Sequence, residues 1–259
     1  MREHLIIIKV GGKIVEEEAS LRTLLKDFSR IAGCKILVHG GGKSATALAE
    51  KLGIETKIVD GRRITDADTL KVATMVYAGL VNKNIVAGLQ ALGTNAIGLS
   101  GADLDIIRAV KRPVGAIDYG FVGDINWVNA QALSELIDNG AVPVIAPITH
   151  DGKGSLLNTN ADTIASELAR SLCSKYELRL IFCFEKQGVL LDESDEKSVI
   201  PEIDPVLFEE LKASGVISGG MIPKLESGFN ALKRGVSAVV ITNAQGISGG
   251  LRGTRLVLS

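Results

Sequence analysis

Three glycine-rich turns with lysines beside them are the part of the sequence best suited to chemistry. The segments 9–13 and 39–44 each follow an apolar run, and the segment 218–224 opens a helix-like stretch. Glycine lets the backbone approach a bound anion closely, and the free N–H groups at the start of a helix add a site for phosphate. Together the turns predict a pocket that holds several phosphate or carboxylate oxygens.

Five further side chains have the chemistry to complete such a pocket. Lys9 ends an apolar strand, where a buried ammonium is costly without an anion nearby, although it could also extend to a solvated rim. Lys224 lies near the positive end of a helix, where a bound phosphate would offset the repulsion. Asp162 follows Asn158 and a second asparagine, and it could instead cap the next helix. Arg63 offers a two-pronged donor for a carboxylate.

Two other phosphate-binding motifs are imitated by the second turn. Gly42-Lys43-Ser44 looks like the end of a P-loop, but position 37 is leucine where that loop needs glycine. The spacing Gly40-x-Gly42-x-x-Ala45, with Asp60 at the end of the next strand, fits a dinucleotide fingerprint better. A NAD-binding oxidoreductase therefore stays an alternative, although it would leave the turns at 9–13 and 218–224 without a purpose.

Composition narrows the class of protein. The chain has 259 residues, a net charge of -1 and 4% aromatic residues, which disfavours nucleic-acid binding. Cys34, Cys173 and Cys183 form no CxxC pair, and we expect them to be small buried side chains in a reducing compartment. The N-terminus leaves no room for a signal peptide, and no apolar run approaches the roughly 20 residues of a membrane span. We expect a cytoplasmic protein with small-molecule partners.

Short β-rich runs alternate with helix-period segments, which predicts an α/β fold with a mainly parallel sheet. Between 106 and 128, glycines separate short β-like runs and predict hairpins. The expected strands are 5–10, 35–39, 57–60, 95–99, 142–148, 178–184 and 237–242, and the expected helices are 19–31, 43–52, 67–78, 81–92, 130–139, 162–174 and 222–234.

As an ordered set, these motifs resemble the amino acid kinase family. The set consists of Lys-x-Gly-Gly, His-Gly-Gly-Gly, Asp-Gly-Arg-Arg-Ile-Thr, Asn-x-Asn-Ala-Asp and Gly-Gly-Met-Ile-Pro-Lys, and the resemblance runs from Lys9 to Arg255. It implies a three-layer αβα sandwich of the carbamate kinase-like type. It also implies a single domain over 1–259, with an N-lobe of about 1–150 for an acylated amino acid and dimerisation and a C-lobe of about 151–259 for ATP.

Within the family, the resemblance is to members that phosphorylate the side-chain carboxylate of N-acetyl-L-glutamate in arginine biosynthesis. A glutamate carboxylate has a pKa near 4.3 and is ionised at neutral pH, so no general base is needed. ATP with Mg²⁺ bound through its phosphates is the implied cofactor, and catalysis would be positioning and charge neutralisation. The same reaction on N-succinyl-L-glutamate and a non-catalytic nucleotide or amino-acid sensor stay open.

The resemblance also assigns roles to residues. Lys9 and Lys224 would stabilise the transferred phosphoryl group, and Asp162 would orient both lysines. Arg63 and Asn158 would hold the acylated amino acid. The glycines of the first two turns, Gly11, Gly12, Gly41 and Gly42, would donate N–H groups to the phosphates and the reacting carboxylate. The nucleotide would also contact Glu185, Lys186, Gln187, Gly188, Val189, Leu190, Val216, Ile217 and Ser218, a stretch where an Asp-Val pair common in relatives is missing.

Four basic residues and the assembly complete the expectations. His39 is expected to pack under the glycine turn. Arg108, Lys111 and Arg112 are expected on a solvated strand face, although one of them could pair with an extra carboxylate on a larger acyl group. By resemblance, we expect a homodimer that arginine does not inhibit.

Overall fold

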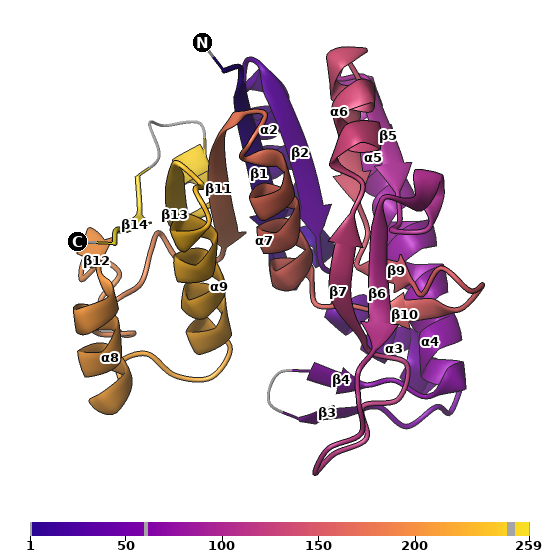
Figure 1. Cartoon of the computed structure of the whole chain (residues 1–259). Helices are drawn as coiled ribbons and strands as arrows, with labels where there is room; N and C mark the ends of the chain where they lie inside the picture. Colours follow the sequence, from indigo (N-terminus) through magenta and orange to yellow (C-terminus); the bar gives the residue numbers. More distant parts are fainter. Residues whose placement is uncertain (1, 60–61, 248–251, 259) are drawn as a thin grey trace.

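One mainly parallel sheet of eight strands runs through the molecule (Figure 1). The computed structural model describes residues 2–59, 62–247 and 252–258. Among these, the sheet pairs in parallel except between β13 and β14. In spatial order its strands are β12 (Glu202–Ile203), β14 (Thr254–Leu256), β13 (Ala238–Asn243), β11 (Glu177–Phe184), β1 (His4–Val10), β2 (Cys34–His39), β8 (Val142–Ile145) and β5 (Ala96–Leu99).

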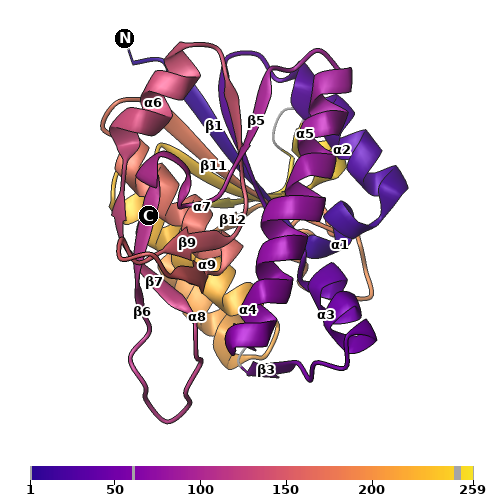
Figure 2. The ribbon, with the colours of Figure 1, turned by 90° about the vertical axis from the view of Figure 1, so that its right-hand side faces the viewer.

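Helices cover both faces of this sheet (Figures 1 and 2). They are α1 (Gly12–Glu16), α2 (Glu18–Arg30), α3 (Gly42–Lys51), α4 (Ala67–Thr74), α5 (Asn82–Ala91), α6 (Ala130–Asp138), α7 (Ala161–Leu172), α8 (Pro205–Ala213) and α9 (Met221–Lys233). The expected three-layer arrangement with a parallel centre is therefore confirmed. The sequence reading missed α1 and α8, although Asp204 caps α8 and Pro205 opens it.

The central strand β1 shows how the chain builds two cores. Successive side chains of a strand point to opposite faces. Leu5 and Ile7 join one core with residues of α7, while Ile8 and Val10 join a second core with residues of α2 and α5. The next odd-numbered residue, Lys9, therefore lies on the face that α7 covers.

Two smaller sheets account for most of the differences from the expected strands. The expected strand 142–148 is divided, because the chain leaves the main sheet after β8 and resumes as β9 (Ile148–His150). β9 belongs to a sheet of order β10 (Leu156–Asn158), β9, β6 (Ile107–Lys111) and β7 (Gly123–Val128), and the antiparallel β6–β7 pair confirms the expected hairpin. β3 (Lys57–Val59) pairs with β4 (Arg62–Ile64) instead of joining the main sheet, and Asp60 lies outside the described residues.

A single helical run replaces the two helices expected over 67–92. A π-helical segment, η1 (Met75–Val81), joins α4 to α5 without a break. The resulting run Ala67–Ala91 is long and apolar enough to cross a membrane by length and composition, contrary to the sequence expectation. In its most apolar window 44% of the residues are buried inside the protein.

The cysteines only partly follow the expectation of burial. Cys183 on β11 is 1% exposed, and this burial raises its pKa to about 12. Cys34 and Cys173 are partly exposed. The described residues contain no group of three or more His, Cys, Asp or Glu side chains that could hold a metal ion.

Candidate functional site

Two lysines and one aspartate, far apart in sequence, meet at the end of β1. The Lys9 Nζ lies 2.9 Å from Asp162 Oδ1, and the Lys224 Nζ lies 3.2 Å from Asp162 Oδ2. The three side chains are only 11%, 16% and 11% exposed in the order Lys9, Asp162, Lys224. This triad confirms that the three residues are close, and it carries two positive charges against one negative charge.

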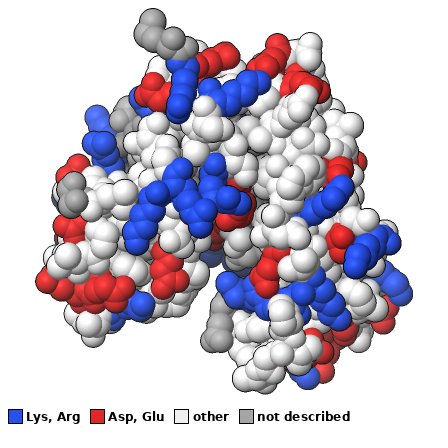
Figure 3. Space-filling view, in the orientation of Figure 1, with Lys and Arg blue, Asp and Glu red and all other residues white. Residues whose placement is uncertain are grey.

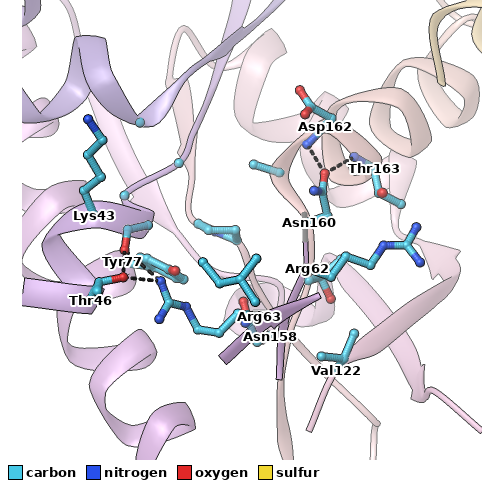
Figure 4. Close-up of a pocket in the computed structure, with 18 of the residues that line it drawn as sticks. Lys43, Thr46, Arg62, Arg63, Tyr77, Val122, Asn158, Asn160, Asp162 and Thr163 are labelled. Atoms are coloured by element: carbon cyan, nitrogen blue, oxygen red, sulfur yellow. Dashed lines mark hydrogen bonds between the residues drawn. The ribbon is translucent and has the colours of Figure 1, made fainter. Parts of the chain in front are cut away.

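The local sequence explains why these side chains converge. Lys9 ends β1 on the face covered by α7, and Asp162 is in the first turn of α7. The cap of α7 is Asn160, whose side chain accepts hydrogen bonds from the N–H groups of Asp162 and Thr163 at 2.8 and 3.2 Å (Figure 4). The alternative role of Asp162 as the cap is therefore wrong, and its carboxylate is free to contact the lysines.

Burial and mutual attraction set the charges of the triad. Burial alone would raise the pKa of Asp162, but the positive charges of Lys9 and Lys224 outweigh it and hold that pKa below its usual value. Burial, together with repulsion from Lys9, lowers the pKa of Lys224 despite the nearby carboxylate. Lys224 therefore bears most of the electrostatic cost of placing two ammonium groups on one carboxylate.

The first two glycine turns lie side by side above the triad. A Cβ on Gly12 would lie 3.7 Å from the nitrogen of Gly42 and 3.8 Å from that of Gly41. The N–H of Gly41 has no hydrogen-bond partner within the described residues, whereas that of Gly11 donates to the Cys183 carbonyl at 2.9 Å. The expectation that Gly11 offers its N–H to a ligand is therefore wrong, because sheet extension already uses it.

Arg63 and Asn158 approach the turns from two other elements. On β4, Arg63 donates through Nη2 to the Gly42 carbonyl at 2.8 Å and to the Thr46 hydroxyl at 2.7 Å (Figure 4). Its Nη1 is buried and has no partner among the described atoms. Asn158 at the end of β10 donates to the Thr65 hydroxyl at 3.0 Å.

A cavity of about 660 Å³ joins these groups. In the space-filling view, Lys and Arg side chains gather near a hollow on this face (Figure 3). The predicted site residues that line the cavity are Lys9, Gly12, Gly41, Gly42, Arg63, Asn158, Asp162 and Glu185. A single cavity thus has Lys9 and Asp162 of the triad in its wall, with an unpartnered arginine nitrogen beside them, while Lys224 reaches Asp162 without lining the cavity.

Most of the expected nucleotide contacts lie elsewhere. Val189, Leu190 and Ile217 are 3%, 7% and 2% exposed and pack into the protein. A Cβ on Gly188 would lie 2.7 Å from the Thr254 hydroxyl, because this segment packs against β14. Lys186, Gln187, Val216 and Ser218 do not line the cavity either, so the nucleotide contacts stay a prediction.

Two cavity residues were missed or misplaced by sequence reasoning. Arg112 was expected on a solvated strand face, but it lines the cavity, pairs with Asp124 and leaves a buried Nη1 without a partner in the described part of the chain. The positions of Arg108, Lys111 and Arg112 in the sequence did not predict that Arg112 lies at the cavity, next to the β6–β7 hairpin. Tyr77, from η1, lines the cavity as well and is 6% exposed. The other two basic residues, Arg108 and Lys111, do not line the cavity.

The position expected for His39 is confirmed. Its side chain is fully buried beneath the second turn, with Nδ1 at 2.8 Å from the Gly40 carbonyl oxygen. Burial lowers the pKa of His39 to about 4, so the ring is neutral at physiological pH.

Comparisons with known proteins agree with this architecture. The model of the amino acid kinase family matches residues 4–243. The acetylglutamate kinase of Phocaeicola vulgatus is 66% identical over 250 residues, covering 96% of this chain and 97% of that protein. Among solved structures, smu.665 from Streptococcus mutans has a TM-score of 0.83 at 27% identity, covering 98% and 99% of the two chains. Carbamate kinase from Giardia lamblia bound to AMP-PNP has a TM-score of 0.72 at 13% identity, covering 98% of each chain.

Proposed function

The chain belongs to the amino acid kinase family, and we propose that it is an acetylglutamate kinase. The reaction is transfer of the γ-phosphoryl group of ATP to the side-chain carboxylate of N-acetyl-L-glutamate, giving N-acetyl-L-glutamyl 5-phosphate and ADP for arginine biosynthesis. Relatives named acetylglutamate kinase at 66%, 63% and 63% identity, each covering nearly the whole chain, support this choice of substrate.

The triad is the observation that carries the proposal. Two ammonium groups lie within 3.3 Å of one carboxylate, so the two positive charges share a single negative partner at ion-pair distance among the described residues. A carboxylate that attacks a triphosphate must approach negative charge, and fixed cations lower that barrier because they need no reorganisation during the reaction. Lys9 and Lys224 stabilise the phosphoryl group in transfer, and Asp162 holds both ammonium groups in place.

The backbone of the glycine turns supplies the second set of donors. The unpartnered N–H of Gly41 lies next to Gly12 and Gly42 at the cavity wall. These N–H groups donate to the phosphate and carboxylate oxygens between which the phosphoryl group moves. Mg²⁺ bound with the nucleotide would neutralise part of the phosphate charge.

Arg63 orients the acylated amino acid. Its Nη2 is held by the Gly42 carbonyl and the Thr46 hydroxyl. The buried Nη1 is therefore left to donate to the α-carboxylate of the substrate. A planar guanidinium already held through Nη2 presents its Nη1 in a fixed direction, which a flexible ammonium does not. Asn158 borders the same cavity and donates to the α-carboxylate or the amide.

We assign the two lobes on the same basis. Residues 1–150 supply the first two glycine turns and Arg63, and they bind the acylated amino acid together with Asn158. Residues 151–259 supply Lys224 and the segments 185–190 and 216–218, over which the nucleotide lies. Because the triad takes Lys9 from one lobe and Asp162 and Lys224 from the other, the reacting groups meet at the boundary.

A coupled ADP-release assay tests the proposal. We expect turnover with MgATP and N-acetyl-L-glutamate and none with free L-glutamate. Lys224→Met should lower kcat by about 10²–10³-fold while MgATP still raises the melting temperature. Lys175→Met, which changes an exposed lysine paired with Asp138, serves as the matched control. A wild-type enzyme without turnover on acylated glutamates would refute the proposal, and a Lys224→Met variant with normal turnover would refute the role of the triad.

One observation favours a second substrate, N-succinyl-L-glutamate. Arg112 has a buried Nη1 without a partner in the described part of the chain, at the wall of the same cavity. N-acetyl-L-glutamate has no carboxylate beyond the two already assigned, whereas a succinyl group adds a third. The same assay with both substrates decides between them, and Arg112→Met should reduce kcat/KM for the succinyl compound alone if Arg112 binds its extra carboxylate.

We also propose a cytoplasmic homodimer that contacts through the helical run Ala67–Ala91. Met75 and Leu80 on this run are 53% and 58% exposed, and the run lies along the surface (Figure 2). Light scattering should give a dimer, and Leu80→Lys should weaken it. We expect turnover to be unchanged by millimolar arginine. A hexamer or a monomer at micromolar concentration would contradict this assembly.

A further inference from the structure

A histidine and an asparagine form a buried polar pair beneath the second glycine turn. His39 ends β2 on the face opposite to the one where Lys9 meets α7, because its neighbour Leu37 packs with α2 and α5. There it meets Asn82, the first residue of α5, at 3.1 Å between Nε2 and Nδ2. His39 and Asn82 are 0% and 1% exposed, so solvent cannot substitute for either partner.

The contacts of this pair fix which ring nitrogen carries the proton. The Asn82 Nδ2 also donates to the Val144 carbonyl at 2.9 Å, so turning the amide over would place two oxygens together. With the amide oriented, its N–H points at His39 Nε2, which must accept. A neutral imidazole that accepts at Nε2 donates at Nδ1, and Nδ1 faces the Gly40 carbonyl at 2.8 Å.

The held carbonyl belongs to the peptide that carries the free N–H of Gly41. In a planar trans peptide the C=O and the N–H point in opposite directions. Holding the Gly40 oxygen toward the buried ring therefore directs the Gly41 N–H the other way. That N–H has no partner within the described residues, and Gly40, Gly41 and Gly42 all line the cavity.

We propose that His39 is a positioning residue: its Nδ1–H holds the Gly40 carbonyl and thereby directs the Gly41 N–H at the reacting oxygens, while Asn82 keeps the imidazole in the required tautomer. The inference rests on the proposed kinase function for the identity of those oxygens. His39 never touches the substrate and exchanges no proton with it.

The helix that carries Asn82 has an unusual turn that serves this arrangement. The π-helical segment η1 ends at Val81, directly before Asn82. A π-turn adds a residue to the helix and rotates everything beyond it. Tyr77 and Val81, within η1, lie next to Gly41. Asn82, directly after η1, contacts His39.

Three substitutions at position 39 separate positioning from packing. His39→Asn keeps an amide donor close to the Nδ1 position, His39→Gln moves the donor out toward the Nε2 position, and His39→Leu removes both. We expect kcat to fall by about 10–10²-fold in His39→Leu and His39→Gln, less than the loss of a whole oxyanion donor. His39→Asn should stay within about threefold of wild type, and the KM for both substrates should change little.

Those kinetics can overturn the inference. A His39→Asn variant as slow as His39→Leu, with matching melting temperatures, would show that the Nδ1 donor is not what matters. A His39→Leu variant that is less stable yet keeps its kcat would show a purely structural histidine.

A ¹⁵N NMR spectrum of the wild-type protein tests the tautomer without any variant. We expect the His39 ring, assigned by its absence in His39→Asn, to show Nδ1 protonated and Nε2 unprotonated. The opposite tautomer would refute the inference even if the enzyme turns over. If the wild-type protein shows the expected tautomer but does not turn over, the proposed kinase function is refuted instead.

Discussion

Removing the carboxylate of the triad should destabilise the unliganded protein more than almost any other isosteric change. Asp162→Asn keeps the shape of the side chain and the cap of α7, because that cap is Asn160. It leaves Lys9 and Lys224, each 11% exposed on its side chain, next to one another without a counterion.

The size of the effect follows from two limits. Removing one partner of a buried ion pair typically destabilises a protein by about 3–5 kcal/mol. The protein can escape a larger cost by releasing a proton from one lysine, and at pH 7 this costs about 4.6 kcal/mol relative to the ordinary lysine pKa of 10.4. We therefore expect a loss of about 4 kcal/mol, which corresponds to a fall in melting temperature of about 8–16 °C for a chain of this size.

Urea and thermal unfolding at pH 7 measure this loss. Asp138→Asn is the matched control, because Asp138 pairs with the half-exposed Lys175, and its melting temperature should stay within about 2 °C of wild type. Inorganic phosphate or MgATP should restore more stability to Asp162→Asn than to wild type, since an anion replaces the missing charge. An Asp162→Asn protein within about 1 kcal/mol of wild type would refute the view of the triad as two cations held by one anion.

Three further outcomes follow from described features. Lys224→Met should raise the melting temperature of the unliganded protein by a few degrees, because the lowered pKa of Lys224 means that folding disfavours its charge; a fall would contradict this sign. Gly41→Ala should cost about 1–3 kcal/mol, since Gly41 has φ 157° and its Cβ would lie 3.1 Å from Tyr77. Gly79→Ala, inside η1 and with open space around it, should instead stabilise by about 0.5–1 kcal/mol in the same urea titration. Because the pKa of His39 is about 4 in the folded protein and about 6.5 unfolded, the unfolded chain binds more protons in between, so stability should fall from pH 6.5 to pH 4 and His39→Asn should show a smaller fall.

The sequence was sufficient for the triad because each member follows a local rule. Lys9 follows a continuous apolar run typical of a buried strand, and Asp162 and Lys224 occur in the first turns of amphipathic helices. Parallel strands place such ends at one edge of a sheet. The choice of cap between Asn160 and Asp162 was not predictable, because either side chain suits that position and only the fold decides which one faces a lysine.

The π-helical segment and the nucleotide segment show where local rules fail. The π-helical segment η1 has no residue type that distinguishes it from an ordinary helix. Its Gly79, within an apolar run, is equally compatible with the end of a helix, so the sequence did not predict a continuous run. In the segment 186–190, Val189 and Leu190 are buried. The neighbouring Gly188 lies against Thr254 of β14, a strand near the C-terminal end of the chain. Pairing between such distant segments leaves no periodic trace in either sequence.

The central place of β1 has a consequence for how the protein is made. β1 leaves the ribosome before β11, yet one of its edges pairs with β11, roughly 170 residues later in the chain. At 5–20 residues per second, that edge waits roughly 10–35 s for its partner. During this interval an apolar strand with unpaired N–H and C=O groups is a template for wrong pairing. We therefore expect mispairing during synthesis to be reduced when β1 is shielded until β11 has been made.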